Sequence, residues 1–250
     1  MICAIMIGRA GSTGFPNKNI KEVLGRYLCE YPLLAAKNSK NIDRIFVSTD
    51  CPIIKETGKM YHATNIERPK NLNTNEALGE DVYQHAYFEI KEILKKENKK
   101  IELIVLLMAN APTITYKLID KGIEILRNNI NFDSAVTTSV YNMWSPIRAR
   151  KLDEKGNLKP FVPFETFGDP KTLNCDRDSQ GDVYYADMSV SVVRPKCLEK
   201  LHEGLLPQKW MGKTIAPIFS EAGCDVDYEW QLPMVEHWLL KNGYKKKNSE

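Results

Sequence analysis

Short apolar runs alternate with amphipathic stretches along the first 140 residues of the chain. Apolar runs of strand length occupy residues 2–7, 44–49, 102–108 and 134–140. The stretches between them that are predicted as helices are residues 32–38, 52–61, 78–97 and 117–128. Strands that alternate with helices favour parallel pairing, with helices on both faces of the sheet. The pattern therefore predicts an α/β fold built on a mainly parallel, twisted sheet.

The pattern changes after Val140. Residues 141–182 are rich in Pro, Asp, Lys and aromatic side chains, and residues 153–157 carry a hairpin signal. A stretch of this length with little apolar core of its own is more often an extension packed on a partner, or a lid, than a plain loop. We therefore expect an inserted arm over residues 141–182.

The rest of the chain is predicted to complete one domain. Residues 183–193 alternate like a strand, and residues 230–242 are predicted as a closing helix. Three consecutive lysines near the C-terminus favour a flexible basic tail over residues 241–250. The expected organisation is a single domain over residues 1–240 into which the arm is inserted.

Composition narrows the function classes. The 250 residues include 43% hydrophobic and 27% charged side chains, and 35 basic against 32 acidic residues leave a net charge of +3. This ordinary globular balance gives no support to nucleic-acid binding. No apolar run approaches the roughly 20 residues of a membrane helix. The six cysteines are scattered singly, which argues against a zinc site and favours reduced thiols in the cytoplasm.

A glycine-rich loop follows the first predicted strand, at residues 8–19. Glycines let backbone N–H groups turn inward around an anion. Arg9 and Lys18 add positive charge at the two ends of the loop, which suits a triphosphate. The loop matches neither the dinucleotide pattern G-x-G-x-x-G nor the P-loop pattern G-x-x-x-x-G-K-[ST]. An ordinary strand-to-helix turn is the alternative, and the two cations favour anion binding over it.

A pair of carboxylates, Asp225 and Asp227, lies near the C-terminus. Two residues spaced by one on an extended segment point the same way and can share a magnesium ion. Mg²⁺ held there would neutralise the phosphates in a nucleotidyl transfer. A solvated turn is the alternative interpretation of an isolated D-x-D triplet.

Five short motifs occur in order along the chain: residues 9–19, residues 44–50, Arg68-Pro69 followed by Leu72, Ala111-Pro112, and Asp225-Val226-Asp227. Each is similar to a motif of the acylneuraminate cytidylyltransferases, whose signatures read roughly A-R-x-G-S-K-G-x-P-x-K-N, R-I-x-V-S-T-D, R-P-x-x-L, P-T-S-P or A-T-A-P, and D-I-D. The similarity extends from residue 1 to about residue 240 with consistent spacing.

The resemblance implies an enzyme that joins CTP to an eight- or nine-carbon α-keto sugar acid and releases pyrophosphate. The anomeric hydroxyl of the sugar would attack the α-phosphorus. It also implies a Rossmann-like, GT-A-like nucleotidyltransferase fold and a homodimer in which the arm reaches the neighbouring subunit's site.

The resemblance further assigns roles to single residues. The implied catalytic residues are Arg9 and Lys18, which contact the triphosphate, and Asp227, the principal Mg²⁺ ligand with Asp225 as its partner. The implied nucleotide-binding residues are Gly11, Ser12, Asn19, Arg68 and Ala77. The implied sugar-binding residues are Asn110, Arg177 and Asp187.

Several positions depart from the family pattern. Thr13 stands where the family usually has a lysine. Met108 and Asn110 stand where sialic-acid members often carry Gln and Thr, and Asp187 replaces the usual Asn. The phosphate and metal ends therefore match, whereas the sugar end is altered. This combination favours a modified nonulosonic acid, or a less usual sugar, over N-acetylneuraminic acid.

Three other functions fit parts of the pattern. An enzyme that activates an octulosonic acid, or another sugar nucleotidyltransferase, would share the phosphate loop and the carboxylates. A glycosyltransferase would also use a D-x-D, but would normally carry it mid-chain and would not need the cationic loop. A nucleotide-binding regulator would leave Asp225 and Asp227 without a role.

Overall fold

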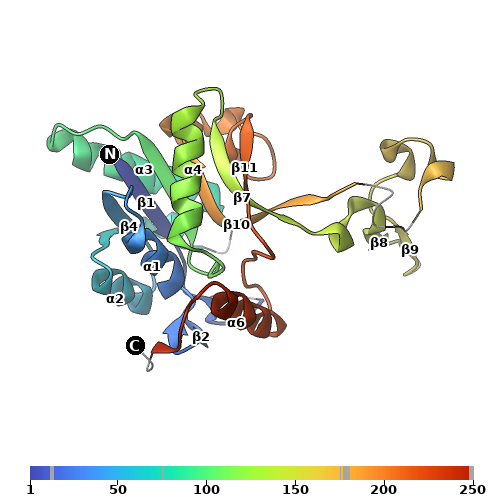
Figure 1. Ribbon diagram of the computed structural model, residues 1–250, viewed down its shortest axis with the longest axis horizontal. Coiled ribbons are helices and arrows are strands. Elements are labelled where there is room, and N and C mark those ends of the chain that lie inside the picture. The colour runs from blue at the N-terminus through green and yellow to red at the C-terminus, as the bar shows by residue number, and fades with distance from the viewer. Residues whose placement is uncertain (12–13, 75, 175, 177–180, 248–250) are drawn as a thin grey trace.

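A seven-stranded sheet forms the centre of the computed structural model, which describes the chain except residues 12–13, 75, 175, 177–180 and 248–250 (Figure 1). In sheet order the strands are β11 (Ile215–Phe219), β7 (Ser134–Val140), β10 (Tyr184–Val193), β6 (Leu103–Met108), β1 (Ile2–Ile7), β4 (Arg44–Ser48) and β5 (Thr64–Ile66). Within the described part of this sheet, only β10 is antiparallel to its neighbours. The prediction of a mainly parallel sheet is confirmed.

Helices cover both faces of this sheet (Figure 1). They are α1 (Glu30–Asn38), α2 (Pro52–Met60), α3 (Gly79–Lys96), α4 (Tyr116–Asn128), α5 (Pro195–Glu199) and α6 (Leu232–Lys241). Side chains alternate across a strand, so Ile2, Ala4 and Met6 of β1 enter the core beneath α1, α2, α4 and α6. Cys3 and Ile5 enter the other core, beneath α3 and α5. None of the helices in the described part of the chain is long and apolar enough to cross a membrane.

Strand β11 is the main element that the apolar pattern does not predict. It pairs with β7 alone, so it forms an edge of the sheet, and it contains Pro217. Proline cannot donate to the hydrogen-bond ladder and is tolerated only at such an edge. A short hairpin of β2 (Glu22–Val23) and β3 (Arg26–Tyr27) follows the phosphate loop, and the sequence pattern does not predict it either.

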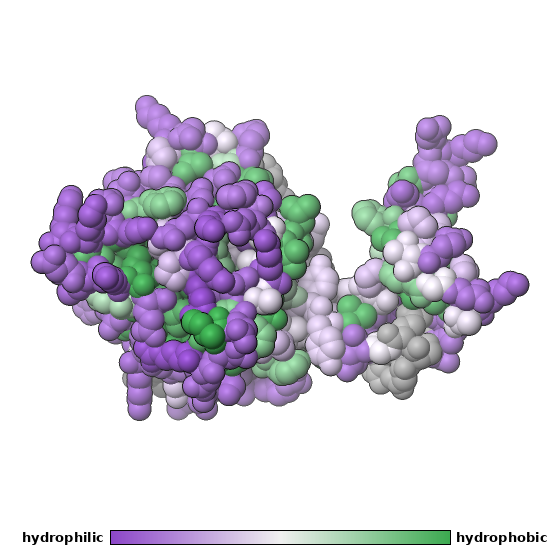
Figure 2. Space-filling model, turned by 90° about the horizontal axis from the view of Figure 1, so that it is seen from above, coloured by the Kyte–Doolittle hydropathy of each residue, from purple (hydrophilic) through white to green (hydrophobic). Residues whose placement is uncertain are grey.

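The segment after β7 stands off from the sheet as an arm (Figures 1 and 2). The predicted hairpin is present as β8 (Arg150–Leu152) and β9 (Leu158–Pro160). Several apolar side chains of the arm are mostly exposed: Met143, Leu152, Leu158 and Phe161, at 66%, 68%, 69% and 59%. Figure 2 shows hydrophobic residues at the surface of this arm. Such exposure is typical of a surface that another molecule covers.

The end of the chain is packed against the domain, so the prediction of a flexible tail is wrong for residues 241–247. The ring of Tyr244 lies edge-on to that of Tyr31, with centroids 5.3 Å apart, and its hydroxyl donates to the carbonyl of Ile114 at 2.7 Å. Lys247 donates its backbone N–H to Leu24 and pairs with Glu30 at 3.1 Å. Tyr244, directly before the three lysines in the sequence, is the aromatic residue that holds the segment against the domain. Residues 248–250 lie outside the described part.

Candidate functional site

A cleft of about 390 Å³ opens beyond the carboxyl ends of β1 and β6. Its walls are Ile7, Gly8, Arg9, Gly14, Phe15, Lys18, Asn19, Arg68, Leu72, Thr74, Ala77, Gly79, Val82, Met108, Asn110, Asp227 and Tyr228. Ligands of parallel α/β sheets characteristically bind at this edge. Seven of the residues singled out from the sequence meet here: Arg9, Lys18, Asn19, Arg68, Ala77, Asn110 and Asp227.

The phosphate loop begins at Gly8, where the chain passes close to the loop after β6. A Cβ at Gly8 would lie 2.6 Å from Cβ of Ala109, so only glycine fits without a shift. The buried side chain of Asn19 donates to the carbonyl of Arg9 at 3.0 Å. Asn19 therefore joins the two ends of the loop.

Arg68 braces the same loop from the side of β4. Its Nη2 donates to the carbonyl of Gly8 at 3.2 Å and to that of Ser48, and its Nε donates to the Ser48 hydroxyl at 3.3 Å. Burial lowers the pKa of the Arg68 guanidinium, and the nearby charge of Arg9 lowers it further against the attraction of Asp50. A half-buried cation of this kind favours an anionic ligand beside it.

Arg9 ties the loop to the segment that leads into α3. Its Nη1 donates to the carbonyl of Thr74 at 3.0 Å. This segment brings Ala77 and Gly79 to the wall of the cleft opposite the phosphate loop. The guanidinium of Arg9 therefore lies between the two walls, as expected for a group that binds a phosphate across them.

Lys18 and Asp227 form an ion pair across the cleft, between the ammonium group and Oδ1 of the carboxylate. The side chain of Lys18 is 18% exposed and that of Asp227 is 53% exposed, so the pair is open to solvent and to ligands. Residues 209 positions apart in sequence thus meet at one point of the site.

Asp225 and Asp227 lie on either side of a fully buried residue, Val226, which anchors the segment in the core. Val226 exchanges backbone contacts with Asn110: its N–H donates to the Asn110 carbonyl at 2.7 Å, and Nδ2 of Asn110 donates to its carbonyl at 3.1 Å. The same Nδ2 lies 3.4 Å from Oδ2 of Asp225. Asn110 therefore holds the carboxylate segment in addition to lining the cleft.

Negative charge is in excess at this segment. Burial raises the pKa of the Asp225 carboxyl, and the charge of Asp227 raises it further, while Lys18 and Asn110 act in the opposite direction. No group of three or more His, Cys, Asp or Glu side chains that could hold a metal occurs in the described part of the chain. Two carboxylates with hard oxygen atoms nevertheless fit Mg²⁺, which commonly takes one or two carboxylates and completes its shell with water and phosphates.

The remaining predicted residues lie elsewhere. Asp187 is 4% exposed and sits behind the cleft, where Oδ2 accepts from Ser139 at 2.8 Å and Oδ1 accepts from the Ser189 N–H at 3.1 Å. A Cβ at Gly223 would lie 2.3 Å from its Oδ2, so Asp187 packs under the loop that leads from β11 to the carboxylates. Gly11 is exposed and is not on the cleft wall. Ser12 and Arg177 lie outside the described residues.

Gln231 is a site residue that the sequence does not reveal. Its side chain binds the backbone of the segment from Asp225 to Tyr228, whose last residue also lines the cleft. A glutamine four positions after an aspartate, at the start of a helix, has no distinctive pattern. The sequence predicts only a helix over residues 230–242, and a side chain in the first turn of a helix can turn back onto the preceding segment.

Comparisons with known proteins agree with this geometry. The family model described as "Cytidylyltransferase" matches residues 3–194. N-acylneuraminate cytidylyltransferase of Oncorhynchus mykiss is 25% identical over 245 residues, which cover 97% of this chain and 51% of that protein. Pseudaminic acid cytidylyltransferase of Campylobacter jejuni is 32% identical over 160 residues, which cover 63% of this chain and 66% of that protein. The chain thus spans from half to just under two thirds of the length of these relatives.

Two solved structures share the fold. CMP:2-keto-3-deoxy-manno-octonic acid synthetase, solved in complex with CTP, superimposes with a TM-score of 0.64 at 13% identity, over 96% of this chain and 99% of the other. A 4-diphosphocytidyl-2C-methyl-D-erythritol synthase from Anaerococcus prevotii gives 0.59 at 18% identity, over 96% of each chain. These identities establish a Rossmann-like nucleotidyltransferase fold and no more. Because the family model covers most of the chain, the chain belongs to the cytidylyltransferase family.

Proposed function

We propose that this protein is a magnesium-dependent cytidylyltransferase that activates a nonulosonic, sialic-acid-like α-keto sugar acid. The anomeric hydroxyl of the sugar attacks the α-phosphorus of CTP, a bond forms between this oxygen and phosphorus, and pyrophosphate leaves. The products are the CMP-sugar and pyrophosphate, and the hydroxyl proton passes to solvent or to a nearby base.

One observation carries the proposal: the cleft brings three cations and a carboxylate together at the carboxyl edge of the sheet. Arg9, Lys18 and Arg68 line one cavity with Asp227. A triphosphate carries enough negative charge to need several cations, and such groups also stabilise the charge that develops on the leaving pyrophosphate. A glycosyltransferase would not need this loop.

Different residues bind the triphosphate and the nucleoside of CTP. Arg9 and Lys18 bind and orient the triphosphate, and the backbone of Gly11 and Ser12 adds N–H donors. Asn19 and Arg68 fix the shape of the loop through the carbonyls of Arg9 and Gly8. Ala77, on the opposite wall, leaves room for the nucleoside.

Asp225 and Asp227 would hold the magnesium ion. When bound, Mg²⁺ supplies charge neutralisation for the phosphates and orients them for displacement. Asp227 reaches the cleft directly, whereas Asp225 stands behind it beside Asn110. Two adjacent carboxylates bind a divalent cation more readily than either alone, and Lys18 would have to release Asp227 when the ion binds.

The sugar acid would bind at the outer end of the cleft. Asn110 contributes an amide there, and Arg177 would pair with the sugar carboxylate. Asp187 acts through the loop at Gly223 that it supports, because its carboxylate is buried away from the cleft. Names of the similar proteins include N-acylneuraminate and pseudaminic acid, both nonulosonic acids, which supports this substrate class.

The arm supports a homodimer. Its exposed apolar side chains, among them Leu152, Leu158 and Phe161, suit burial against a second subunit. In such a dimer the arm would reach the neighbouring cleft and help to enclose the sugar. We also propose a cytoplasmic enzyme, since the five described cysteines are free and buried, as is usual for reduced proteins.

An octulosonic acid is the alternative substrate, because a solved synthetase for an octonic acid shares the fold over nearly the whole chain. The test is a panel in which the protein, CTP and Mg²⁺ are incubated with N-acetylneuraminic, legionaminic, pseudaminic and octulosonic acids while pyrophosphate is measured. We expect release with a modified nonulosonic acid. Release with octulosonic acid alone would replace the substrate class, and no release with any triphosphate and acid would refute the enzyme.

A further inference from the structure

A short turn joins the carboxylate segment to helix α6, and one side chain turns back to bind it. Gln231 is the last residue of this turn. Its Oε1 accepts from the N–H of Asp227 at 2.7 Å and from the N–H of Tyr228 at 2.8 Å. Its Nε2 donates to the carbonyl of Asp225 at 3.3 Å. A single amide thus satisfies three backbone groups of the segment.

Two residues fix different parts of the carboxylate segment. Asn110 holds the middle of the segment through both backbone groups of Val226. The N–H of Asp227 lies beyond this contact, and Gln231 is its sole hydrogen-bond acceptor within the described parts of the chain. The side chain of Asp227 is 53% exposed, so packing does little to orient it. Lys18 contacts its Oδ1 from across the cleft, and Gln231 fixes the backbone from which the carboxylate projects.

We infer that Gln231 is a positioning residue for a divalent cation site. By binding the N–H of Asp227 and the carbonyl of Asp225, it fixes the backbone that carries the two carboxylates. The inference rests on the proposed function for the identity of the cation site, but it concerns a residue to which neither the motifs nor the comparisons assign a role. Gln231 itself contacts neither cation nor nucleotide in this arrangement. Its effect is a preformed ligand geometry in place of a mobile turn.

Two substitutions separate the roles of the amide. Gln231→Met keeps the length of the side chain and removes all three hydrogen bonds. Gln231→Glu keeps an acceptor for the two N–H groups, removes the donor to Asp225 and adds one negative charge. Gln84→Met is the matched control, since Gln84 also donates to a backbone carbonyl, that of Leu198 at 2.7 Å, on α3.

The measurement is the binding of Mn²⁺ to the full chain without nucleotide, followed by the electron paramagnetic resonance of free Mn²⁺. A hydrogen bond contributes a factor of about five to an equilibrium. Because only part of the loss of three such bonds acts on the cation site, Gln231→Met should weaken Mn²⁺ binding about tenfold. Gln231→Glu should restore most of the affinity, and Gln84→Met should leave it unchanged. In turnover assays, Gln231→Met should raise the metal concentration for half-maximal rate while leaving kcat at saturating metal within about threefold.

Several outcomes would overturn the inference. These are parent-like Mn²⁺ affinity in Gln231→Met, an equal loss in Gln84→Met, a Gln231→Glu variant as weak as Gln231→Met, or no Mn²⁺ binding by the parent chain. Failure of the proposed function is distinct, because Mn²⁺ binding would then persist without pyrophosphate release from any triphosphate. Thermal melting of each variant identifies a general loss of folding, which would also count against a local role.

Discussion

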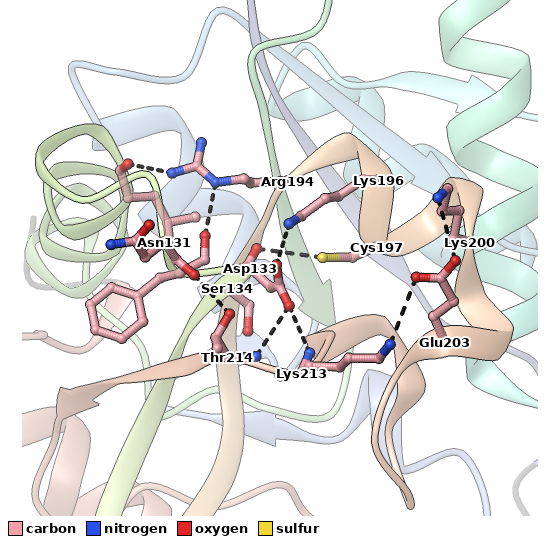
Figure 3. Close-up of polar contacts among 12 residues, drawn as sticks. Asn131, Asp133, Ser134, Arg194, Lys196, Cys197, Lys200, Glu203, Lys213 and Thr214 are labelled. Atoms are coloured by element: carbon pink, nitrogen blue, oxygen red, sulfur yellow. Dashed lines mark hydrogen bonds and ion pairs between the residues drawn. The ribbon is translucent and has the colours of Figure 1, made fainter.

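Two aspartates at opposite edges of the same sheet show that the same type of side chain can stabilise the fold in one place and be suited to a ligand in another. Asp133 precedes β7 at the amino edge, and Asp225 lies beside Asn110 at the carboxyl edge. Oδ2 of Asp133 accepts from the N–H groups of Lys213 and Thr214 at 2.8 and 3.1 Å, and its Oδ1 pairs with Lys196 (Figure 3). Asp133 thus receives three donors, one of them a lysine, whereas Asp225 receives one amide donor from Asn110 at 3.4 Å.

The pKa values express this difference. Burial alone would raise the pKa of Asp133, but Lys196 and the two backbone donors outweigh it and lower the pKa to about 2. Burial also acts on Asp225, where the neighbouring Asp227 adds to it and the pKa rises. A site whose charges are all satisfied stabilises the fold, and a site with unsatisfied charge is suited to a ligand. Each prediction below probes one side of this contrast.

The largest effect should come from the carboxyl edge. Asp227→Ala removes the carboxylate that reaches the cleft, so we expect kcat/KM to fall by more than about a hundredfold. Thermal stability should change little, because the side chain is 53% exposed. Steady-state pyrophosphate release and a melting curve measure both. Glu203→Ala, at an exposed carboxylate near Asp133, is the control and should leave turnover unchanged; near-normal turnover in Asp227→Ala would remove it from the site.

At the amino edge the same kind of change should act on stability alone. Asp133→Asn leaves Lys196 without its charge partner and weakens two backbone hydrogen bonds, which should lower the free energy of unfolding by about 2 kcal/mol. Urea denaturation measures this loss, and activity per folded molecule should stay within about twofold.

The pH dependence adds a second test of Asp133. The pKa of Asp133 is depressed from 3.8 to about 2, so its stabilisation is present above the unfolded value and is lost as pH falls through 2. Asp133→Asn should lose this acid-dependent part of its unfolding free energy. An unchanged acid transition in the variant would contradict the structural role.

The contrast also explains what could be predicted from the sequence. The layered fold follows from short apolar runs that alternate with amphipathic helices. Each buried strand must be covered by helices, and this order of elements gives a parallel sheet with helices on both faces. Arg9, Lys18 and Asp227 were found because their residue types and spacing carry chemical meaning by themselves. They meet in one cleft because they all follow carboxyl strand ends or loops at that edge.

Residues whose role depends on a tertiary neighbour were missed or misplaced. Gln231 acts only because a turn brings it back to Asp227. Asp187 matches a family position, yet a buried pair of partners, Ser139 and the Ser189 N–H, takes its carboxylate away from the cleft. Tyr244 holds the lysine-rich end of the chain against the domain through its contact with Ile114, whereas the composition of this end predicts a solvated tail. No local pattern encodes such contacts.

A smaller effect should follow from the ion pair that joins the two sides of the cleft. Lys18 contacts the carboxylate that would bind the metal, so the ammonium and a cation compete for Asp227. Lys18→Gln should therefore strengthen Mn²⁺ binding in the absence of nucleotide by up to about fivefold, the range of a partly exposed ion pair. Lys55→Gln, which breaks an exposed pair with Glu67 elsewhere, is the control. Weaker Mn²⁺ binding in Lys18→Gln would show that Lys18 supports the metal site.

The smallest effect concerns stability at the carboxyl edge and has the opposite sign to that at Asp133. The folded-state pKa of Asp225 is raised, so the folded chain holds this proton more tightly than the unfolded chain. The contribution of Asp225 to stability therefore falls as pH rises from its ordinary range through the raised pKa.

Asp225→Asn removes the charge that disfavours folding, so at pH 7 it should raise the melting temperature, by roughly 2 °C for a chain of this size. The same substitution should weaken Mn²⁺ binding, and Mg²⁺ should then stabilise the parent more than the variant. Differential scanning calorimetry from pH 5 to pH 8, with and without Mg²⁺, measures both. A variant that melts below its parent at every pH would show that Asp225 stabilises the fold as Asp133 does, and the contrast between the two edges would fail.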